Sequence, residues 1–267
     1  MSKYKLHMKL ISYTIIFFNI ITHTAFSQSI SYNLEIGYTI FFNTERPTSQ
    51  KGILYLDSLK EKSLFIYGKN TESSVKQNDE ESTEYDLFYA GKKKVFYQNI
   101  NKDTLISRIN LFSGQFLVKE KIPTLKWEIH DEEKTLDKYL LKKATLYFRG
   151  RNYVAWYSEE YPLSFGPWKF SGLPGLIMEI YDTTKRYHWQ INSIKQTKNT
   201  TLDLEPILKG KETLTLKQYA DRKFNNNDQF KKMASKMPKG VQVTQIKVAR
   251  TGFEIKFEWE EENKKDN

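Results

Sequence analysis

Residues 164–180 read Ser-Phe-Gly-Pro-Trp-Lys-Phe-Ser-Gly-Leu-Pro-Gly-Leu-Ile-Met-Glu-Ile, and no other part of the sequence is so unusual in composition. A Gly-Pro pair at 166–167 and a Pro-Gly pair at 174–175 predict two turns, which bracket an aromatic segment containing Trp168 and Phe170. The residues after the second turn are mostly apolar, as in a buried strand. The stretch therefore predicts a tight connection that leads into the core of a β structure.

The aromatic segment has two interpretations that the sequence leaves open. Proline fixes φ at about −65° and glycine supplies a positive φ, so residues 173–176 are typical of a type II turn with Gly175 at its third position. Gly172, just before that turn, allows the backbone to pass close to another part of the chain. Trp168 and Phe170 then either pack into the core or form a contact surface for a ligand or a partner.

The start of the chain is typical of a secretory signal peptide, which we assign to residues 1–27. Three lysines precede a mostly apolar run at 10–21, which is too short to span a bilayer, and residues 25–27 have the small side chains of a cleavage site. An uncleaved N-terminal anchor is the alternative. We expect export without a transmembrane segment after cleavage, and the periplasm rather than the cell exterior, because the charged tail after Trp259 does not resemble a sorting domain.

Composition limits the classes of function. The chain has 42 Lys and Arg against 32 Asp and Glu, a formal charge of +10, but the basic residues are scattered among acids. Nucleic-acid binding needs basic residues gathered on one face, so we exclude it. There is no cysteine and hence no disulfide. A chain of this length buries a full core without disulfides, and residues 28–267 are therefore expected to form a single β-rich domain.

Alternation of aromatic and polar residues predicts a succession of strands joined by short turns. Such a meander builds an antiparallel sheet. The polar residues 69–83 predict a long loop. The expected strands cover residues 32–40, 52–56, 63–67, 84–89, 94–98, 104–109, 115–119, 125–130, 139–148, 153–157, 176–181 and 187–194.

Helical signals come only near the end of the sequence. Thr215 and Gln218 form a capping box, which predicts a helix over 216–224. A second helix is expected at 229–237, and two last strands at 241–249 and 252–259. The fold class is therefore mainly β, a curved antiparallel sheet or half-open barrel with two short C-terminal helices packed on it.

The segment 127–180 resembles the GLPGLI family of exported Bacteroidetes proteins, also known as Porph_ging-type proteins. Residues 148–156, Phe-Arg-Gly-Arg-Asn-Tyr-Val-Ala-Trp, and residues 166–172, Gly-Pro-Trp-Lys-Phe-Ser-Gly, stand before the motif as in that family. Weaker similarity extends over about 30–192. The motif that gives the family its name is present in full as Gly172, Leu173, Pro174, Gly175, Leu176 and Ile177.

The resemblance implies an exported β-rich domain of unknown activity and supplies no catalytic residue. The family often has Gly-Tyr-x-Cys where this sequence has Lys-Tyr-Leu-Leu at 138–141, so any role of that cysteine is absent here. If the source belongs to the same phylum, Ser58, Thr104 and Thr183 also fit its O-glycosylation pattern, since each follows an aspartate.

Groups for acid–base or nucleophilic chemistry are sparse after the leader. The two histidines there are His130 and His188, and only Glu128 is placed to share a strand face with His130, which is too few ligands for a metal site. No nucleotide or hydrolase motif is present, and we expect no cofactor. Arg149 and Arg151 share a face if their strand is regular, either as an anion clamp or as a charged strand edge.

Three classes of function follow from these observations. We favour a non-enzymatic periplasmic binding or accessory domain that serves an envelope protein or an apolar ligand. A carrier of an apolar, lipid-like ligand needs a cavity lined by residues such as Trp168, Phe170 and Trp189. A structural protein instead has these rings in a filled core, and a hydrolase needs acidic and basic groups gathered in one cleft.

Overall fold

The computed structural model describes residues 29–57, 59–68, 93–111, 114–210, 212–224 and 249–262. These residues form one sheet of twelve strands, the 3-10 helix η1 (Ile100–Lys102) and the α-helices α2 (Leu216–Phe224) and α4 (Glu258–Glu262). The strands are β1 (Ser29–Phe42), β2 (Thr48–Asp57), β3 (Lys62–Gly68), β4 (Lys94–Asn99), β5 (Thr104–Leu111), β6 (Gly114–Glu120), β7 (Glu128–Leu136), β8 (Tyr139–Phe148), β9 (Arg151–Ser158), β10 (Leu176–Asp182), β11 (Tyr187–Asp203) and β12 (Thr213–Thr215).

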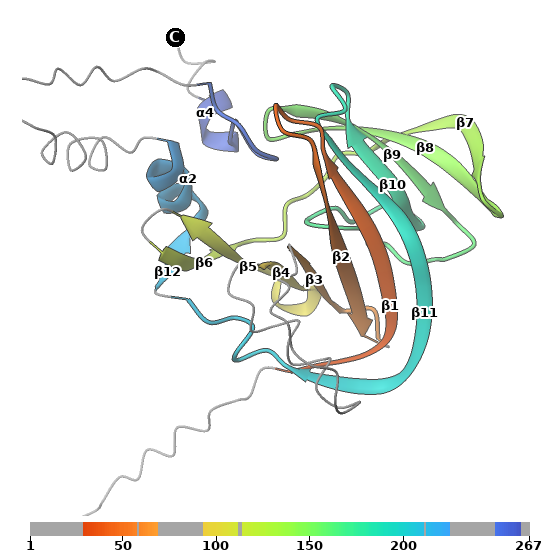
Figure 1. Cartoon of the computed structure of the whole chain (residues 1–267), viewed down its shortest axis with the longest axis horizontal. Coiled ribbons are helices and arrows are strands. Elements are labelled where there is room, and N and C mark those ends of the chain that lie inside the picture. The colour runs from red at the N-terminus through yellow and green to blue at the C-terminus, as the bar shows by residue number, and fades with distance from the viewer. Residues whose placement is uncertain are drawn as a thin grey trace, which may run out of the picture.

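The sheet is made of two meanders joined side by side. Its strand order is β12-β6-β5-β4-β3-β2-β1-β11-β10-β9-β8-β7. Within each meander neighbours in space are neighbours in sequence, and among the strand pairs of the described residues only that of β12 with β6 is parallel. The sheet is open and strongly curved, with β1 and β11 bending around its concave side (Figure 1). The mainly β fold expected from the sequence is confirmed.

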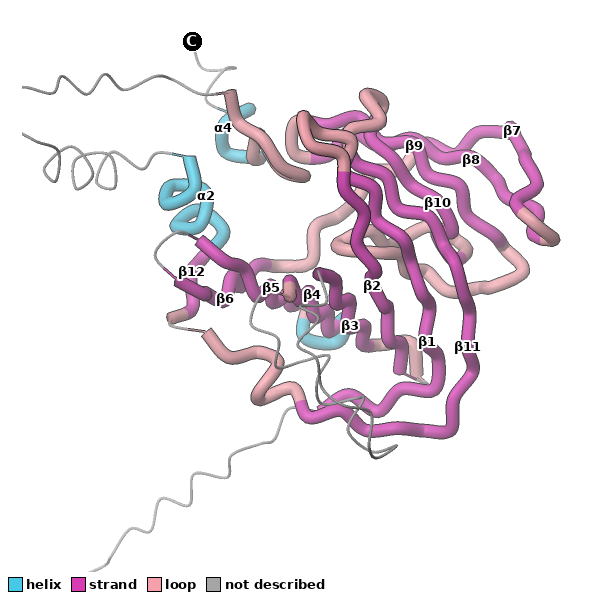
Figure 2. Tube along the Cα trace, in the orientation of Figure 1, coloured by secondary structure: helices cyan, strands magenta, loops and turns pink. Residues whose placement is uncertain are grey.

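Irregular pairing accompanies the curvature of the two longest strands. The register between β1 and β11 shifts at Gly37/Tyr38, where Asn192 is the extra residue, and again after Tyr32. Extra residues of this kind bend a strand and increase its twist. Figure 2 shows the curved paths of β1 and β11, with α2 and α4 near one end of the sheet.

The connection from β9 to β10 packs into the core of the sheet. Phe165, Trp168 and Phe170 are at most 2% exposed and belong to one core cluster with rings and aliphatic side chains from both meanders. The connection satisfies its own backbone, since the Gly172 N–H donates to Ser164 O at 3.0 Å and the Ile177 N–H to Phe165 O at 3.1 Å. A buried loop needs such pairing, because unpaired backbone groups are unfavourable there.

The two glycines of the motif have roles opposite to those expected. Gly172 has a φ of 94°, a conformation that favours glycine, and a Cβ there would meet nothing closer than Trp127 Nε1 at 3.8 Å. Gly175 lacks a positive φ, but a Cβ on it would overlap the carbonyl oxygen of Ser158. The type II turn expected at 173–176 is therefore wrong, because close packing on β9, and not turn geometry, explains Gly175.

The C-terminal part agrees with the sequence only in its first helix. The capping box of α2 is formed, with the Gln218 N–H donating to Thr215 Oγ1 at 3.2 Å and the Thr215 N–H to Gln218 Oε1 at 2.8 Å. The strand expected at 252–259 is wrong, since this segment is irregular until α4. The strand expected at 84–89 and the helix expected at 229–237 lie outside the described residues, as do all residues but Ala249 of the strand expected at 241–249.

None of the helices formed by the described residues has the length and hydrophobicity that a membrane crossing requires.

We expect Gly175→Ala to destabilise the fold more than Gly172→Ala. The first change forces a methyl group into the β9 backbone, and such overpacking costs about 3 kcal/mol or more when backbone must move. The second change strains one residue by roughly 1–2 kcal/mol without a clash. Urea unfolding followed by tryptophan fluorescence measures both. An equal loss in the two variants would contradict the close-approach role of Gly175.

Candidate ligand-binding cavity

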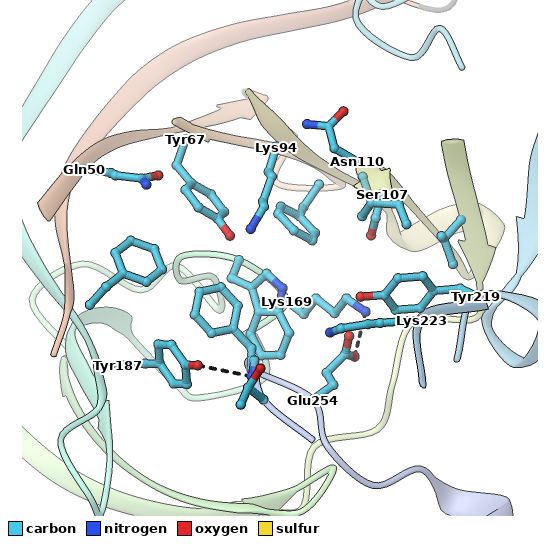
Figure 3. A pocket seen from close by; sticks show the side chains of 18 of the residues that line it. Gln50, Tyr67, Lys94, Ser107, Asn110, Lys169, Tyr187, Tyr219, Lys223 and Glu254 are labelled. Carbon is cyan, nitrogen blue, oxygen red and sulfur yellow. Dashed lines mark hydrogen bonds and ion pairs between the residues drawn. The ribbon is translucent and has the colours of Figure 1, made fainter. Parts of the chain in front are cut away.

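A cavity of about 430 Å³ lies on the concave side of the sheet. Its walls come from the ends of β1 and β2, from β3 to β6, from α2, from the turn at residues 167–170 and from the segment 251–254. Its volume falls in the range of about 300–1,000 Å³ that is common for small-molecule sites. Figure 3 shows the side chains that point into it.

One wall of the cavity is aromatic. The Trp168 and Phe253 rings meet edge to face with their centroids 5.3 Å apart, and the Trp168 and Phe96 rings do so at 6.4 Å. Phe42 stacks on Phe253 at 6.0 Å, and Tyr67 stacks on Phe96 at 6.0 Å. These rings form an apolar part of the cavity wall.

The backbone of Trp168 has a strained conformation. Trp168 is the second residue of a turn closed by the Phe170 N–H, which donates to Pro167 O at 3.2 Å, and its φ is 59°. A bulky residue with positive φ is strained and persists only when its surroundings hold it. Here the indole is held among Phe170 and Trp189, at centroid distances of 4.9 and 6.2 Å.

The cavity also receives charged side chains, as Figure 3 shows. Lys169 donates to Glu254 Oε1 at 2.8 Å, and this carboxylate and ammonium balance each other. Lys94 and Lys223 form no ion pair with any described residue. Instead, the Lys94 ammonium lies 5.5 Å from the centroid of Tyr67, and the Lys223 ammonium lies 4.7 Å from that of Phe224.

Burial changes the ionisation of both lysines. Lys94 is an exposed residue, yet its ammonium group lies at the cavity, and loss of hydration there lowers its pKa. Burial lowers the pKa of Lys223 to about 8, with Glu254 opposing and Lys94 and Lys169 adding to the shift. With a pKa of about 8, Lys223 is largely protonated at neutral pH, so the cavity holds positive charge that the described residues leave unbalanced.

Beside the cavity lies a buried ionic cluster of Arg149, Lys169, Glu120 and Glu254. Their side chains are 3–7% exposed. Arg149 donates to Glu120 Oε2 at 2.6 Å and to Glu254 Oε1, and Lys169 donates to Glu120 Oε1 at 2.5 Å. The more exposed Glu258 accepts from Arg149 Nε at 2.9 Å. Two cations thus face two buried carboxylates.

The cluster keeps Glu254 ionised. Burial alone would raise its pKa, but the charges of Lys169 and Arg149 and their hydrogen bonds outweigh it and hold the pKa at about 2. The same carboxylates raise the pKa of Arg149 against the effect of its burial. Glu254 is therefore an anchor for the C-terminal segment and a poor proton donor or acceptor near neutral pH.

Local turn geometry brings Arg149 to this cluster. Arg149 and Gly150 have φ values of 46° and 87° and form the two-residue turn between β8 and β9, which requires positive φ at both positions. The Arg149 carbonyl also accepts from Ile255 N at 3.0 Å and Lys256 N at 3.2 Å. Backbone and side chain of one turn residue therefore hold the C-terminal segment.

Arg151 holds the same segment from a second side. Its Nε donates to Gly252 O at 2.7 Å and its Nη1 to Asp182 Oδ2 at 3.0 Å. The Gly252 N–H donates to the Tyr187 hydroxyl at 3.1 Å (Figure 3). The expectation that Arg149 and Arg151 share a strand face is wrong, because Arg149 lies in the turn. Both arginines bind groups of the chain itself.

The remaining candidate residues lie apart from the cavity. Phe170 and the motif residues Leu173, Leu176 and Ile177 are buried in the core beneath it. Thr104 donates to Lys102 O at 2.8 Å, and Thr183 is exposed in the turn after β10. Ser58 lies outside the described residues.

The two histidines have separate partners in the sheet. His130 lies 2.8 Å from Thr145 Oγ1, which also donates to Glu128, and His188 lies 2.9 Å from Glu179. The described part of the chain contains no group of three or more His, Cys, Asp and Glu side chains able to hold a metal ion.

Sequence reasoning missed Lys94, Lys223, Ser107 and Glu254. Lys169 had a signal, since it stands beside Trp168 in the unusual stretch. The others sit in ordinary alternating or helical patterns that resemble those of solvated residues. The packing of β4, β5, α2 and the segment 251–254 around one cavity brings them together.

We expect Glu254→Gln to destabilise the protein by about 3–5 kcal/mol at pH 7, because it leaves the buried cations Arg149 and Lys169 facing a single buried carboxylate, that of Glu120. The pKa of Glu254 is about 2 when folded and about 4.3 when unfolded, so its stabilisation is present above pH 4.3 and is lost as the pH falls toward 2. Urea unfolding should therefore show that the free energy of unfolding falls less between pH 7 and pH 3 in the variant than in the original protein.

Glu258→Gln is the matched control, since it removes the partner of Arg149 that is 56% exposed and should have little effect. Two outcomes would show that the buried cluster does not stabilise the fold. One is equal destabilisation by the two variants, and the other is a fall in the free energy of unfolding from pH 7 to pH 3 that is as large in Glu254→Gln as in the original protein.

Comparisons with solved structures find only distant likeness. Two crystal forms of PNGF-II are each 15% identical, with TM-scores of 0.49 and 0.48, over 71% of this chain and 32% of theirs. This chain thus spans about a third of their length. A LolA superfamily protein from Nitrosomonas europaea is 8% identical, with a TM-score of 0.27, over 64% of this chain and 87% of that one.

No curated protein matches the sequence. A family model does match, over the residues that contribute Arg149, Trp168 and Lys169 to the cavity and the ionic cluster. Residues 149–179 match the model described as "Protein of unknown function (Porph_ging)", which confirms the GLPGLI-family resemblance of this chain.

Proposed function

We propose that this protein is a non-enzymatic binding domain that holds an apolar small molecule in the cavity on the concave side of its sheet. The observation that carries this proposal is the cavity itself, which has an aromatic wall and an opening to solvent. Trp168 belongs both to the core and to this wall, so the two interpretations of the aromatic segment meet in one residue.

Rigid walls support a binding role. The segment 251–254 has no regular secondary structure, yet it is fixed through Arg149, Arg151, Tyr153 and Tyr187. A pre-formed cavity loses less conformational entropy on binding than one that a ligand must first organise. These anchors therefore favour a lasting cavity over a space that side chains refill.

A hydrolase is the less favoured alternative. Among the described residues that line the cavity there is no histidine, and the carboxylate present, that of Glu254, is held ionised with a pKa of about 2. General acid–base catalysis works best when the catalytic pKa lies near the operating pH. The cavity as described is therefore better suited to binding than to proton transfer.

Binding can be tested with the uncharged fluorescent probe N-phenyl-1-naphthylamine and a variant that narrows the cavity. Thr48 lines the cavity from an exposed position at the start of β2, so Thr48→Trp should obstruct it without disturbing the core. We expect the protein to increase the fluorescence of the probe. We also expect Thr48→Trp to weaken binding at least about tenfold, or roughly 1.4 kcal/mol.

Ser49→Trp is the control, because adjacent strand residues point to opposite faces and Ser49 does not line the cavity. Thermal unfolding should be similar in both variants. An absence of probe binding to the original protein, or equal weakening by the two changes, would reject the cavity as the binding site.

We also propose that residues 1–27 are removed and that the domain works in the periplasm. The leader pattern described above supports this proposal. Fractionation of the source cells, with the mass of the purified protein, tests it. A mass that corresponds to residues 28–267 in the periplasmic fraction is expected, and a full-length cytoplasmic product would contradict it.

A further inference from the structure

The polar groups of the cavity indicate which kind of apolar molecule it holds. This inference rests on the proposed binding function and concerns the same cavity. Two of its lysines and one of its hydroxyl groups have no hydrogen-bond or ion-pair partner among the described residues, and Figure 3 shows all three pointing into the same space.

The first observation is the pair of lysines. Long lysine side chains on a surface normally extend their ammonium groups into water. Lys94 and Lys223 instead turn theirs inward over aromatic rings, where burial lowers the pKa of each. Keeping two such cations near one another is unfavourable unless an anion compensates them.

The second observation is independent of charge. Ser107 lies on β5 opposite Phe96 and is 2% exposed, and its Oγ is buried without a partner in the described structure. A buried hydroxyl without a hydrogen bond is an unfavourable arrangement that native proteins rarely keep without a reason. A ligand oxygen in the cavity would satisfy it.

The third observation is that the neighbouring groups are donors. Burial raises the pKa of both Tyr67 and Tyr219, so their hydroxyl groups stay protonated, and Figure 3 shows both directed toward the lysines. Glu254 is balanced by Lys169 and Arg149. Ammonium groups and hydroxyls around one space match an anion with several acceptor oxygens, such as a carboxylate or a phosphate.

We propose that the cavity selects amphipathic anions, with a carboxylate or phosphate head group between Lys94, Lys223 and Ser107 and an apolar body against Trp168 and Phe253. The aromatic wall supplies the contact for the body, and the donors supply recognition of the head group. An uncharged molecule of the same length gains only the first of these.

The proposal predicts a dependence on pH. Four charged groups from other segments act on Lys223, and Tyr219 lies near it on α2. These groups are Glu254 in the C-terminal segment, Lys94 on β4, Lys169 in the turn at 167–170 and Arg151 on β9. The pKa of Lys223 is about 8 in the free protein, and a bound anion raises it. Affinity for the anion should therefore fall as the pH rises from 7 to 9.5, whereas affinity for an uncharged ligand should not.

The test is competition against N-phenyl-1-naphthylamine by decanoate, decyl phosphate and 1-decanol. We expect at least one of the two anions to bind at least about tenfold more tightly than the alcohol. Lys94→Met and Lys223→Met should each weaken that anion about tenfold, a larger change than either variant causes for the probe or 1-decanol. Ser107→Ala should weaken it about threefold. The better anion identifies the head group as carboxylate or phosphate.

Lys217→Met is the control, because Lys217 lies on the same helix as Lys223 but pairs with Asp221 at the surface. Equal binding of the anions and 1-decanol overturns the head-group site while leaving the binding function intact, since the probe still binds. Failure of the probe itself rejects the binding function. If a lysine variant does not fold, the pH dependence of the original protein decides, and anion affinity that is unchanged from pH 7 to 9.5 overturns the proposal.

Discussion

The fold depends on one buried interaction, the contact of Arg149 and Lys169 with Glu120 and Glu254. Each of the four side chains comes from a different segment: the end of β6, the turn between β8 and β9, the turn at 167–170 and the C-terminal segment. Removing any one leaves a charge in a low-dielectric interior, which is far less favourable than an exposed charge. The cluster therefore obliges four distant segments to meet in one arrangement.

The interior charges fall into two groups, those of the buried ionic cluster and those of the cavity. In the cluster, positive and negative charges match, and their role is to hold the C-terminal segment as a wall. Across that wall, Lys94 and Lys223 have no matching carboxylate among the described residues. Glu254 cannot serve both groups, since Lys169 and Arg149 already compensate it. The pairing of Glu254 with Lys169 and Arg149 thus fixes the wall of the cavity and also leaves the positive charge within the cavity uncompensated.

Local sequence patterns predicted the elements well and their meeting points poorly. The strand expected at 139–148 is β8, and the capping box of Thr215 and Gln218 is formed, because both depend on neighbouring residues. The alternating residues at 252–259 are not a strand, since Glu254 turns inward to Arg149 and Lys169. Gly175 was explained by turn chemistry, whereas the carbonyl of Ser158 on β9 requires it. Contacts between segments far apart in sequence leave no local pattern to detect.

The pairing of β1 with β11, which joins the two meanders, also constrains the order in which the sheet forms. β1 begins the described sheet, yet its partner β11 lies more than 140 residues further along the chain, as in the contact of Ser31 with Thr201 across 170 positions. Pairing at such separation is slow, because a long loop must close before the contact forms. The first meander keeps an open edge until β11 pairs with β1, and the cavity wall at residues 251–254 forms only when the C-terminal segment has also packed. The cavity is therefore completed last, and a product that ends before residue 251 lacks one of its walls.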